Sequence, residues 1–279
     1  MLDQVIGIYI LIDDILKTLG HKEDIRCQMS DSEVITTLLV ASIFFGGNQS
    51  QARSYLQSEG HIPQMLSASR FNRRLHRNWE LILAIFQLLG DLFKHSNDSA
   101  RYLVDSFPVA VCHNIRISKS KILKGKQFRG KCVSKRSYFY GFKVFLITTE
   151  TGLPVEMAFV PGAWAEIRGL EALPVDLPAG SELYGDSGFT NYLFEDLFLE
   201  KDQIELNICR RKNSKRGDLY PISLWKKQQR RFIETVFSVI QTRFPKKIHA
   251  VSIQGFMIKL IGFILIHGID LFLKQQLAT

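Results

Sequence analysis

The spacing of apolar residues changes near position 100, and this change constrains the fold more than any other feature of the sequence. Before it, apolar residues recur every three or four positions, for example across residues 3–19, which predicts amphipathic helices. After it, short apolar runs such as 102–105 predict strands, and helical patterns follow them. Strands interspersed with helices indicate an α/β or α+β core. We therefore predict an all-helical domain at 1–98 and a domain at 99–279 in which helices flank a mixed sheet.

The same patterns predict the individual elements. Ser30-Asp31-Ser32-Glu33 offers N-caps to the second helix. The last helix is very apolar, but Lys259, His267 and Asp270 interrupt it, which favours a packed helix over a membrane span. The full set comprises helices at 3–19, 31–45, 50–58, 67–93, 166–173, 191–199, 229–240 and 253–273, with strands at 102–105, 138–148, 154–160, 182–186 and 204–209.

Two features of the sequence bear on its cellular compartment. The N-terminus lacks a basic region and contains Asp13 and Asp14, which argues against a signal peptide. The cysteines are far apart and form no CxxC pair, so we expect neither a zinc site nor a disulfide framework. These cysteines are Cys27, Cys112, Cys132 and Cys209. We expect a cytoplasmic protein.

Charge is distributed unevenly along the chain. Residues 1–100 carry 9 basic and 11 acidic side chains, whereas residues 101–279 carry 27 and 16. Residues 106–149 contain no Asp or Glu but ten Lys and Arg. A folded surface normally mixes both signs, so we predict a basic insertion at about 107–137 that holds phosphate backbone; a solvated basic loop is the alternative. The side chains that we assign to DNA are Arg116, Lys119, Lys121, Lys124, Lys126, Arg129 and Lys131.

A second basic cluster begins the helix predicted at 67–93. Four of its arginines are spaced i, i+3, i+4 and i+7 and so share one face: Arg70, Arg73, Arg74 and Arg77. A short helix, a turn and a helix with an arginine stripe resemble a helix-turn-helix. We predict that this face binds DNA; a solvated face on a bundle helix is the alternative. A further basic loop contains Arg211 and Lys212.

Three acids stand where a side chain can be directed into a site. Asp105 and Asp186 end predicted strands, and Glu234 lies on a helix, one turn from Arg230. An ordinary surface pair with Arg230 is the alternative for Glu234. Carboxylates brought together repel one another, and oxygen-only ligands favour Mg²⁺ or Mn²⁺. The apolar residues that we expect to face the core beside Glu234 are Phe232, Ile233, Val236, Phe237, Ile240 and Phe244.

The order of these acids and several phrases around them resemble the DDE transposases, and in particular the bacterial insertion-sequence group nine-eighty-two. The resemblance implies an RNase H-like catalytic core in which Asp105, Asp186 and Glu234 are catalytic and bind two Mg²⁺ (or Mn²⁺) ions. The matching phrases are Val104–Val109, Asn114–Ile117, Tyr140–Lys143, Pro161-Gly162, Leu177–Ser181, Gly185-Asp186, Arg211–Arg216, Ile233–Ser238, Phe244–Lys246 and Ile248–Ala250.

The helix of Glu234 follows the family signature Tyr-x2-Arg-x3-Glu-x6-Lys only in part. Arg230 matches its Arg, which implies a DNA contact, whereas Lys227 and Gln241 replace its Tyr and Lys. Ser187 and Phe145 stand where the family often has Lys and His. The sequence therefore keeps the three acids while it departs from the family at four nearby positions.

The resemblance also implies a function. A transposase of this kind binds the terminal inverted repeats of an insertion sequence and catalyses metal-dependent cleavage and strand transfer on double-stranded DNA. We expect a homodimer or larger assembly on DNA, in the bacterial cytoplasm with the nucleoid, and no membrane or small-molecule substrate. Two alternatives remain: a non-catalytic DNA-binding protein, such as a regulator or decayed transposase, and an RNase H-like nuclease without strand transfer.

Overall fold

The computed structural model describes residues 1–132, 136–211 and 213–278, with the backbone alone described for residue 230 and for 276–278. The chain divides into two compact units, Met1–Leu89 with Arg243–Thr279, and Gly90–Thr242. We predicted that 99–279 forms one catalytic domain; instead, the C-terminal segment groups with the N-terminal helices. The two units are called here the helical unit and the sheet unit.

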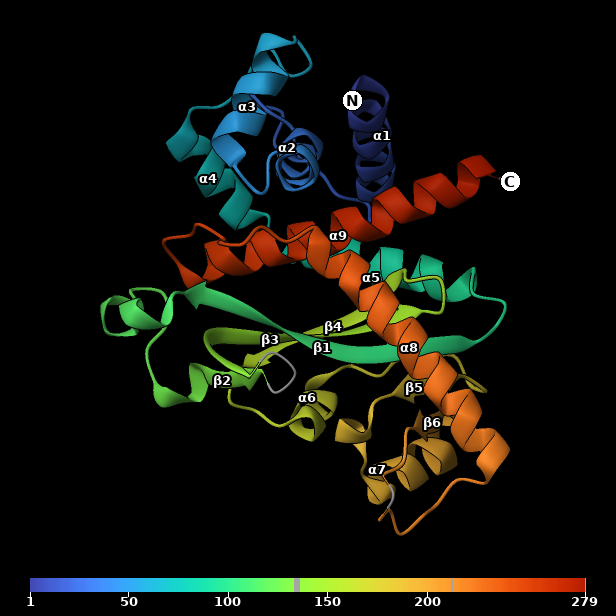
Figure 1. Ribbon diagram of the computed structural model, residues 1–279. Coiled ribbons are helices and arrows are strands. Elements are labelled where there is room, and N and C mark those ends of the chain that lie inside the picture. The colour runs from blue at the N-terminus through green and yellow to red at the C-terminus, as the bar shows by residue number, and fades with distance from the viewer. Residues whose placement is uncertain (133–135, 212, 279) are drawn as a thin grey trace. The chain divides into compact units, whose positions relative to one another are not determined.

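The helical unit is built around α2, which is buried along most of its length. This helix begins as predicted, because Ser30 and Glu33 form a capping box in which each side chain accepts from the other's backbone N–H, at 3.1 and 2.7 Å. The unit contains α1 (Leu2–Thr18), α2 (Asp31–Phe44), α3 (Gln49–Ser58), α4 (Ala68–Arg77), most of α5 (Trp79–His95) and α9 (Ile253–Ala278) (Figure 1).

Helix α9 is long and apolar enough to cross a membrane over Ile253–Gln275, by length and composition. However, 72% of that window is buried inside the structure, as in the core helix of a soluble fold. Within the helical unit α9 packs on α2 and α4. Burial of this extent agrees with the packed helix that the sequence predicted.

The single helix predicted at 67–93 is wrong: α4 ends at Arg77 and α5 begins at Trp79. Between them, Asn78 leaves helical geometry with φ −80° and ψ 14°. Its side chain is buried and donates from Nδ2 to Asp31 Oδ1 at 2.7 Å. The partner lies 47 residues earlier, so helical periodicity gave no sign of the break.

The sheet unit holds a mixed sheet with β1 at its centre. One neighbour of β1 is the antiparallel β3, whose far side pairs with β2 and β4; the other is the parallel β5, followed by the parallel β6. Figure 1 shows this arrangement. The strands are β1 (Arg101–Cys112), β2 (Arg129–Cys132), β3 (Ser137–Thr149), β4 (Pro154–Pro161), β5 (Glu182–Gly185) and β6 (Glu205–Ile208).

Helices cover the sheet and connect its strands. Helix α6 lies close to β3 because residue 169 is a glycine: a Cβ there would fall 2.0 Å from the Phe145 ring. Helix α8 runs obliquely over β1 and β5 (Figure 1). The elements are η1 (Asn114–Lys119), η2 (Lys126–Phe128), α6 (Glu166–Ala172), η3 (Ser187–Phe189), α7 (Tyr192–Leu197), the π-helical turn η4 (Phe198–Asp202) and α8 (Tyr220–Thr242).

Two further predictions are corrected in this unit. Strand β1 does not end at Asp105 but continues to Cys112, because antiparallel pairing with β3 supports it beyond the acid. The basic insertion predicted at 107–137 therefore begins inside a strand. On α8, Ile233 and Phe237 are buried as predicted, but Phe232 is 43% exposed, because the buried stripe is narrower than the apolar pattern.

Candidate active site

The ladder between β1 and β5 brings Asp105 and Asp186 together. Val104 and Gly185 are the last pair in this parallel register; Asp105 follows Val104 within β1, and Asp186 is the first residue after β5. Paired positions on neighbouring strands lie about 4.8 Å apart at the backbone. In each aspartate, Oδ1 accepts the backbone N–H of the next residue at 2.7 Å. The two side chains are thus held in the same way at the point where β5 ends.

Helix α8 is fixed to the sheet by aromatic contacts at two levels. Near its start, the Trp225 ring lies 6.1 Å from the Tyr184 ring, and the Arg101 guanidinium lies 5.3 Å from the Trp225 ring. Near its end, the Phe237 ring lies 6.4 Å from the Phe107 ring. Arg101 and Phe107 point to the same face of β1, because successive side chains alternate. The helix therefore follows one face of β1 between these contacts.

This anchoring places Glu234 at the level of Asp105. A helix rises about 1.5 Å per residue, so Glu234 stands about 13.5 Å beyond Trp225. A strand advances about 3.4 Å per residue, so Asp105 stands about 13.6 Å beyond Arg101. Because the two starting residues touch, the helix brings Glu234 alongside Asp105. Glu234 itself is exposed and lies one turn before the buried Phe237.

A fourth carboxylate, Glu166, reaches the same place from the opposite face of the sheet. Ser106 Oγ donates to Glu166 Oε2 at 2.7 Å, and Lys143 Nζ donates to Glu166 Oε1 at 2.8 Å. Lys143 also donates to the Trp164 carbonyl at 2.8 Å. Gly188 packs against Glu166 so closely that a Cβ would lie 3.0 Å from Glu166 Cγ. Glu166 is thus fixed beside the first two acids.

Glu166 is not among the site residues that the sequence predicted. It opens a predicted helix, where an acid is ordinary. Its partners, Ser106 and Lys143, lie 60 and 23 residues away in the chain. No local spacing connects these three positions, so the sequence gave no sign that Glu166 contacts Ser106 and Lys143.

The other three acids affect the pKa of Asp105. Burial raises the pKa of Asp105 to about 7, the hydrogen bond from Ser106 N–H opposes this rise, and the charges of Glu166, Asp186 and Glu234 add to it. All three carboxylates are therefore close enough to act on Asp105. A raised pKa of this size indicates a site that needs added positive charge to hold its acids ionised.

The carboxylate oxygens of the three predicted acids do not all lie within 4.8 Å of one another, the separation expected for ligands of one ion. Among the described residues, only His21, Glu23 and Asp31 have their ligand atoms all within 4.8 Å of one another. That group lies in the helical unit, where Arg74, Asn78 and His21 already bond to Asp31.

The sequence of this chain matches a known protein family. A family model described as a transposase DDE domain matches residues 95–249, more than half of the 279-residue chain. The chain belongs to this family. The match contains all four acids of the cluster. Searches of curated proteins and of solved structures found no match. A DDE transposase domain is a DNA-cleaving and DNA-joining enzyme domain, and its family uses divalent metal ions.

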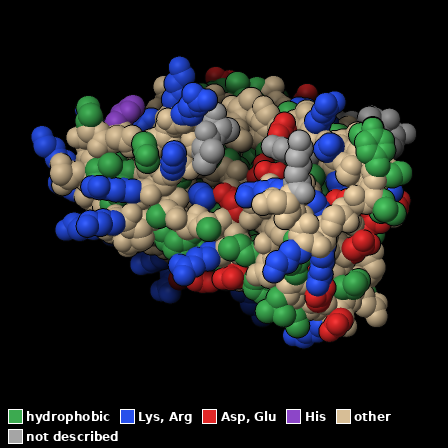
Figure 2. Space-filling view, turned by 60° about the horizontal axis from the view of Figure 1, so that its bottom comes forward, with side chains coloured by type: hydrophobic (Ala, Val, Ile, Leu, Met, Phe, Trp, Pro, Cys, Tyr) green, Lys and Arg blue, Asp and Glu red, His purple; other side chains and the backbone are tan. Residues whose placement is uncertain are grey.

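The basic insertion of this DDE domain forms an exposed surface. All seven side chains that we assigned to DNA between residues 116 and 131 are exposed, and among the described residues none of them forms an ion pair. Figure 2 shows Lys and Arg side chains on the left of the molecule, which η1, η2 and β2 form. A depression of about 270 Å³ there is lined by Lys124, Lys126 and Arg129. A cationic surface without counter-ions suits a phosphate backbone.

The arginine stripe of α4 divides into two kinds of residue. Arg70, Arg73 and Arg77 are exposed and line a depression of about 360 Å³. Arg74 instead bonds to Asp31, and this bond, with those from Asn78 and His21, outweighs burial and holds the pKa of Asp31 below its usual value. The linker of residues 59–67 between α3 and α4 is longer than the three-to-four-residue turn typical of a helix-turn-helix. DNA binding by this stripe stays a prediction.

The remaining predicted DNA contacts lie on the loop after β6 and on α8. Arg211 Nε lies 3.4 Å from Ser187 Oγ, directly after Asp186. A cation thus stands beside the second acid although position 187 is a serine. Lys212 lies outside the described residues, and so does the side chain of Arg230.

We predict that the two basic surfaces contribute differently to DNA binding. Each lysine or arginine removed from the insertion should lower the salt dependence of the logarithm of the binding constant by about 0.9. Loss of Arg73 and Arg77 should instead reduce preference for transposon ends over random DNA. Fluorescence anisotropy over a salt series distinguishes these effects, and an equal loss of preference from both sets would contradict the division. The insertion variant carries alanine at Lys124, Lys126, Arg129 and Lys131.

Proposed function

We propose that this chain is a transposase that binds the terminal inverted repeats of an insertion sequence, cleaves the DNA and joins the freed ends to target DNA. The observation that carries the proposal is the convergence of Asp186, Glu234 and Glu166 on Asp105 within a DDE transposase domain. The exposed cationic insertion supplies a surface for the DNA backbone in the same unit.

The central position of β1 supports an RNase H-like core. That resemblance implies that the strand of Asp105 lies in the middle of the sheet, and here β1 has two further strands beyond it on one side and β3 with its partners on the other. The ordered phrases shared with insertion-sequence group nine-eighty-two support membership of that group.

The donor set fits two Mg²⁺ or Mn²⁺ ions. Asp105, Asp186 and Glu234 would hold them, because all three offer only carboxylate oxygens. Such ions activate a nucleophile and stabilise the leaving oxygen in phosphoryl transfer. The chain's own residues fix the frame: the sheet holds Asp105 near Asp186, α8 brings Glu234 to them, and Lys143 holds Glu166 beside them.

The decisive experiment is an assay of purified protein with Mg²⁺ and DNA that carries the inverted repeats flanking its gene. The proposal expects cleavage at the repeat ends and joining of those ends to target DNA, and neither on DNA with scrambled repeats. Cleavage without joining would favour an RNase H-like nuclease. Specific binding without cleavage would favour a regulator or decayed transposase.

We further propose a cytoplasmic protein that acts as a dimer or larger assembly on DNA, since two ends must be brought together. Light scattering of the protein mixed with paired end DNA reports the mass of that complex. A mass of one protein per DNA end without pairing would contradict the assembly.

A further inference from the structure

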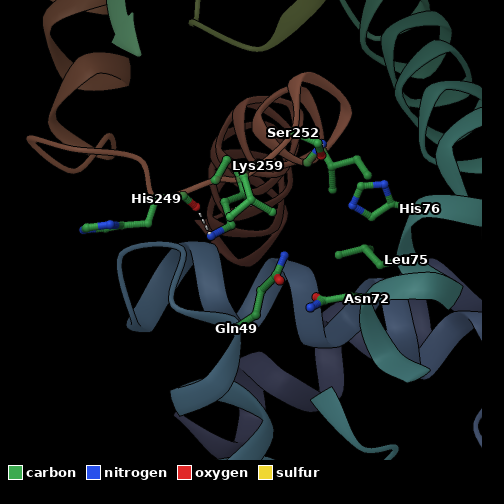
Figure 3. A pocket seen from close by; sticks show the side chains of 11 residues that line it. Gln49, Asn72, Leu75, His76, His249, Ser252 and Lys259 are labelled. Carbon is green, nitrogen blue, oxygen red and sulfur yellow. Dashed lines mark hydrogen bonds between the residues drawn. The ribbon is translucent and has the colours of Figure 1, made fainter. Parts of the chain in front are cut away.

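The helical unit contains a cavity of about 400 Å³ among α3, α4 and the start of α9. Figure 3 shows the side chains of Gln49, Asn72 and Lys259 turned toward a common space. Leu75 and Ile258, both buried, form part of its wall. Cavities of about 300–1,000 Å³ with apolar walls and a few polar groups are typical of small-molecule and cofactor sites. The cavity lies outside the acid cluster, which belongs to the other unit.

Lys259 brings a positive charge into this cavity. Its Nζ donates to the His249 carbonyl at 2.6 Å. Among the described residues, neither this cavity nor the neighbouring one of about 230 Å³, which shares Lys259 and Gln49, is lined by Asp or Glu. Burial lowers the pKa of Lys259 below its usual value, and a bound anion would oppose that effect.

The cavity also offers a flat ring and two amides. His76 is held in place by Gln254: His76 Nδ1 lies 3.0 Å from Gln254 Oε1, and Gln254 Nε2 donates to the His76 carbonyl at 3.1 Å. Unstacked bases stack on aromatic side chains, including histidine. Amides such as those of Gln49 and Asn72 match the paired donor and acceptor of a base edge.

We propose that this cavity receives one nucleotide displaced from a DNA strand, with its phosphate beside Lys259 and its base beside His76, Gln49 and Asn72. A ligand that suits this cavity carries one anionic group and one flat ring that forms hydrogen bonds, and a nucleotide has both. The inference rests on the proposed function only in taking DNA as the source of the nucleotide.

The test compares fluorescein-labelled duplex DNA with the same duplex carrying one unpaired adenosine nucleotide, because an unpaired nucleotide costs least to displace. Anisotropy is measured in EDTA, so that no cleavage occurs. Wild-type protein should bind the bulged duplex about tenfold more tightly, and Lys259→Met should remove that preference. Lys247→Met is the matched control, since Lys247 is exposed, lies nearby in the chain and does not line the cavity.

One further variant controls for misfolding, and competition experiments distinguish a nucleotide within DNA from a free nucleotide or phosphate. Asn72→Ala, at an exposed position, should weaken the preference about threefold while leaving the melting temperature unchanged. In competition, dAMP should displace the bulged duplex more effectively than deoxyadenosine or inorganic phosphate. Equal loss of the preference in Lys247→Met, or no preference in the wild type, would overturn the inference. Tight dAMP binding without a bulge preference would also overturn it, in favour of a free nucleotide.

An outcome for this cavity is separable from an outcome for the acid cluster. Protein that prefers bulged DNA through Lys259 but cuts no transposon ends would support this site and contradict the proposed enzyme. Protein that cuts ends with the preference absent would do the reverse.

Discussion

Asp105→Asn, Asp186→Asn and Glu234→Gln should each lower end cleavage and strand transfer by at least about 10³-fold, because groups that act as a unit fail together. Each change removes one charged ligand from the set that we propose for the two ions. The strand register and the α8 contacts involve other side chains, so the fold and DNA affinity should persist. Gel assays of cleavage and joining, with anisotropy for DNA binding, measure both.

Glu171→Gln is the matched control for these variants. Glu171 lies on α6 with Glu166 but is exposed. Its neutralisation should leave cleavage within about twofold, as expected for a surface change. If Glu234→Gln joined ends at a near wild-type rate, Glu234 would not be a metal ligand. Its position beside Asp105 would then follow only from the packing of α8 on the sheet.

The sequence predicted the parts of this fold that depend on local pattern. The capped start of α2 and five of the six strands follow from spacing and turn residues within a few positions, whereas β2 lies in the stretch that was predicted as a basic insertion. The resemblance to a transposase family supplied the order of the acids, which spacing alone cannot show to converge. What brings them together is the register of Val104 with Gly185 and the packing of α8, and both pair residues far apart in the chain.

The features that the sequence missed are tertiary contacts between distant polar residues. Asn78 ends α4 because it bonds to Asp31. Arg74 bonds to the same carboxylate and is therefore less exposed than the other arginines of the stripe. Glu166 joins the acid cluster because Ser106 and Lys143 hold it there. Helical periodicity treats all of these as ordinary polar positions, so only the folded structure distinguishes them.

Without divalent ions, Asp105→Asn should stabilise the protein, and the gain should grow with pH. The pKa of Asp105 is about 7 in the folded state against a usual 3.8, so the folded state binds this proton more tightly than the unfolded chain. Stability therefore falls as pH rises from about 4 to about 7, and the loss is complete above that range. Asparagine does not titrate and still offers an oxygen to Ser106 N–H. Above pH 7 the gain should reach about 2–4 kcal/mol, the lower value allowing for partial solvent contact.

Calorimetry in EDTA at about pH 5 and about pH 8 tests this difference, with a larger gap in melting temperature expected at the higher pH. Glu166→Gln is the opposing control: its carboxylate accepts from Lys143 and Ser106, so its neutralisation should lower the melting temperature. Added Mg²⁺ should stabilise the wild type but not Asp105→Asn, because an ion that binds only the folded state shifts unfolding upward. A wild type more stable than Asp105→Asn at pH 8 in EDTA would contradict acid repulsion at this site. In that case the charges of Glu166, Asp186 and Glu234 would not destabilise ionised Asp105, and a bound ion would have no repulsion to offset.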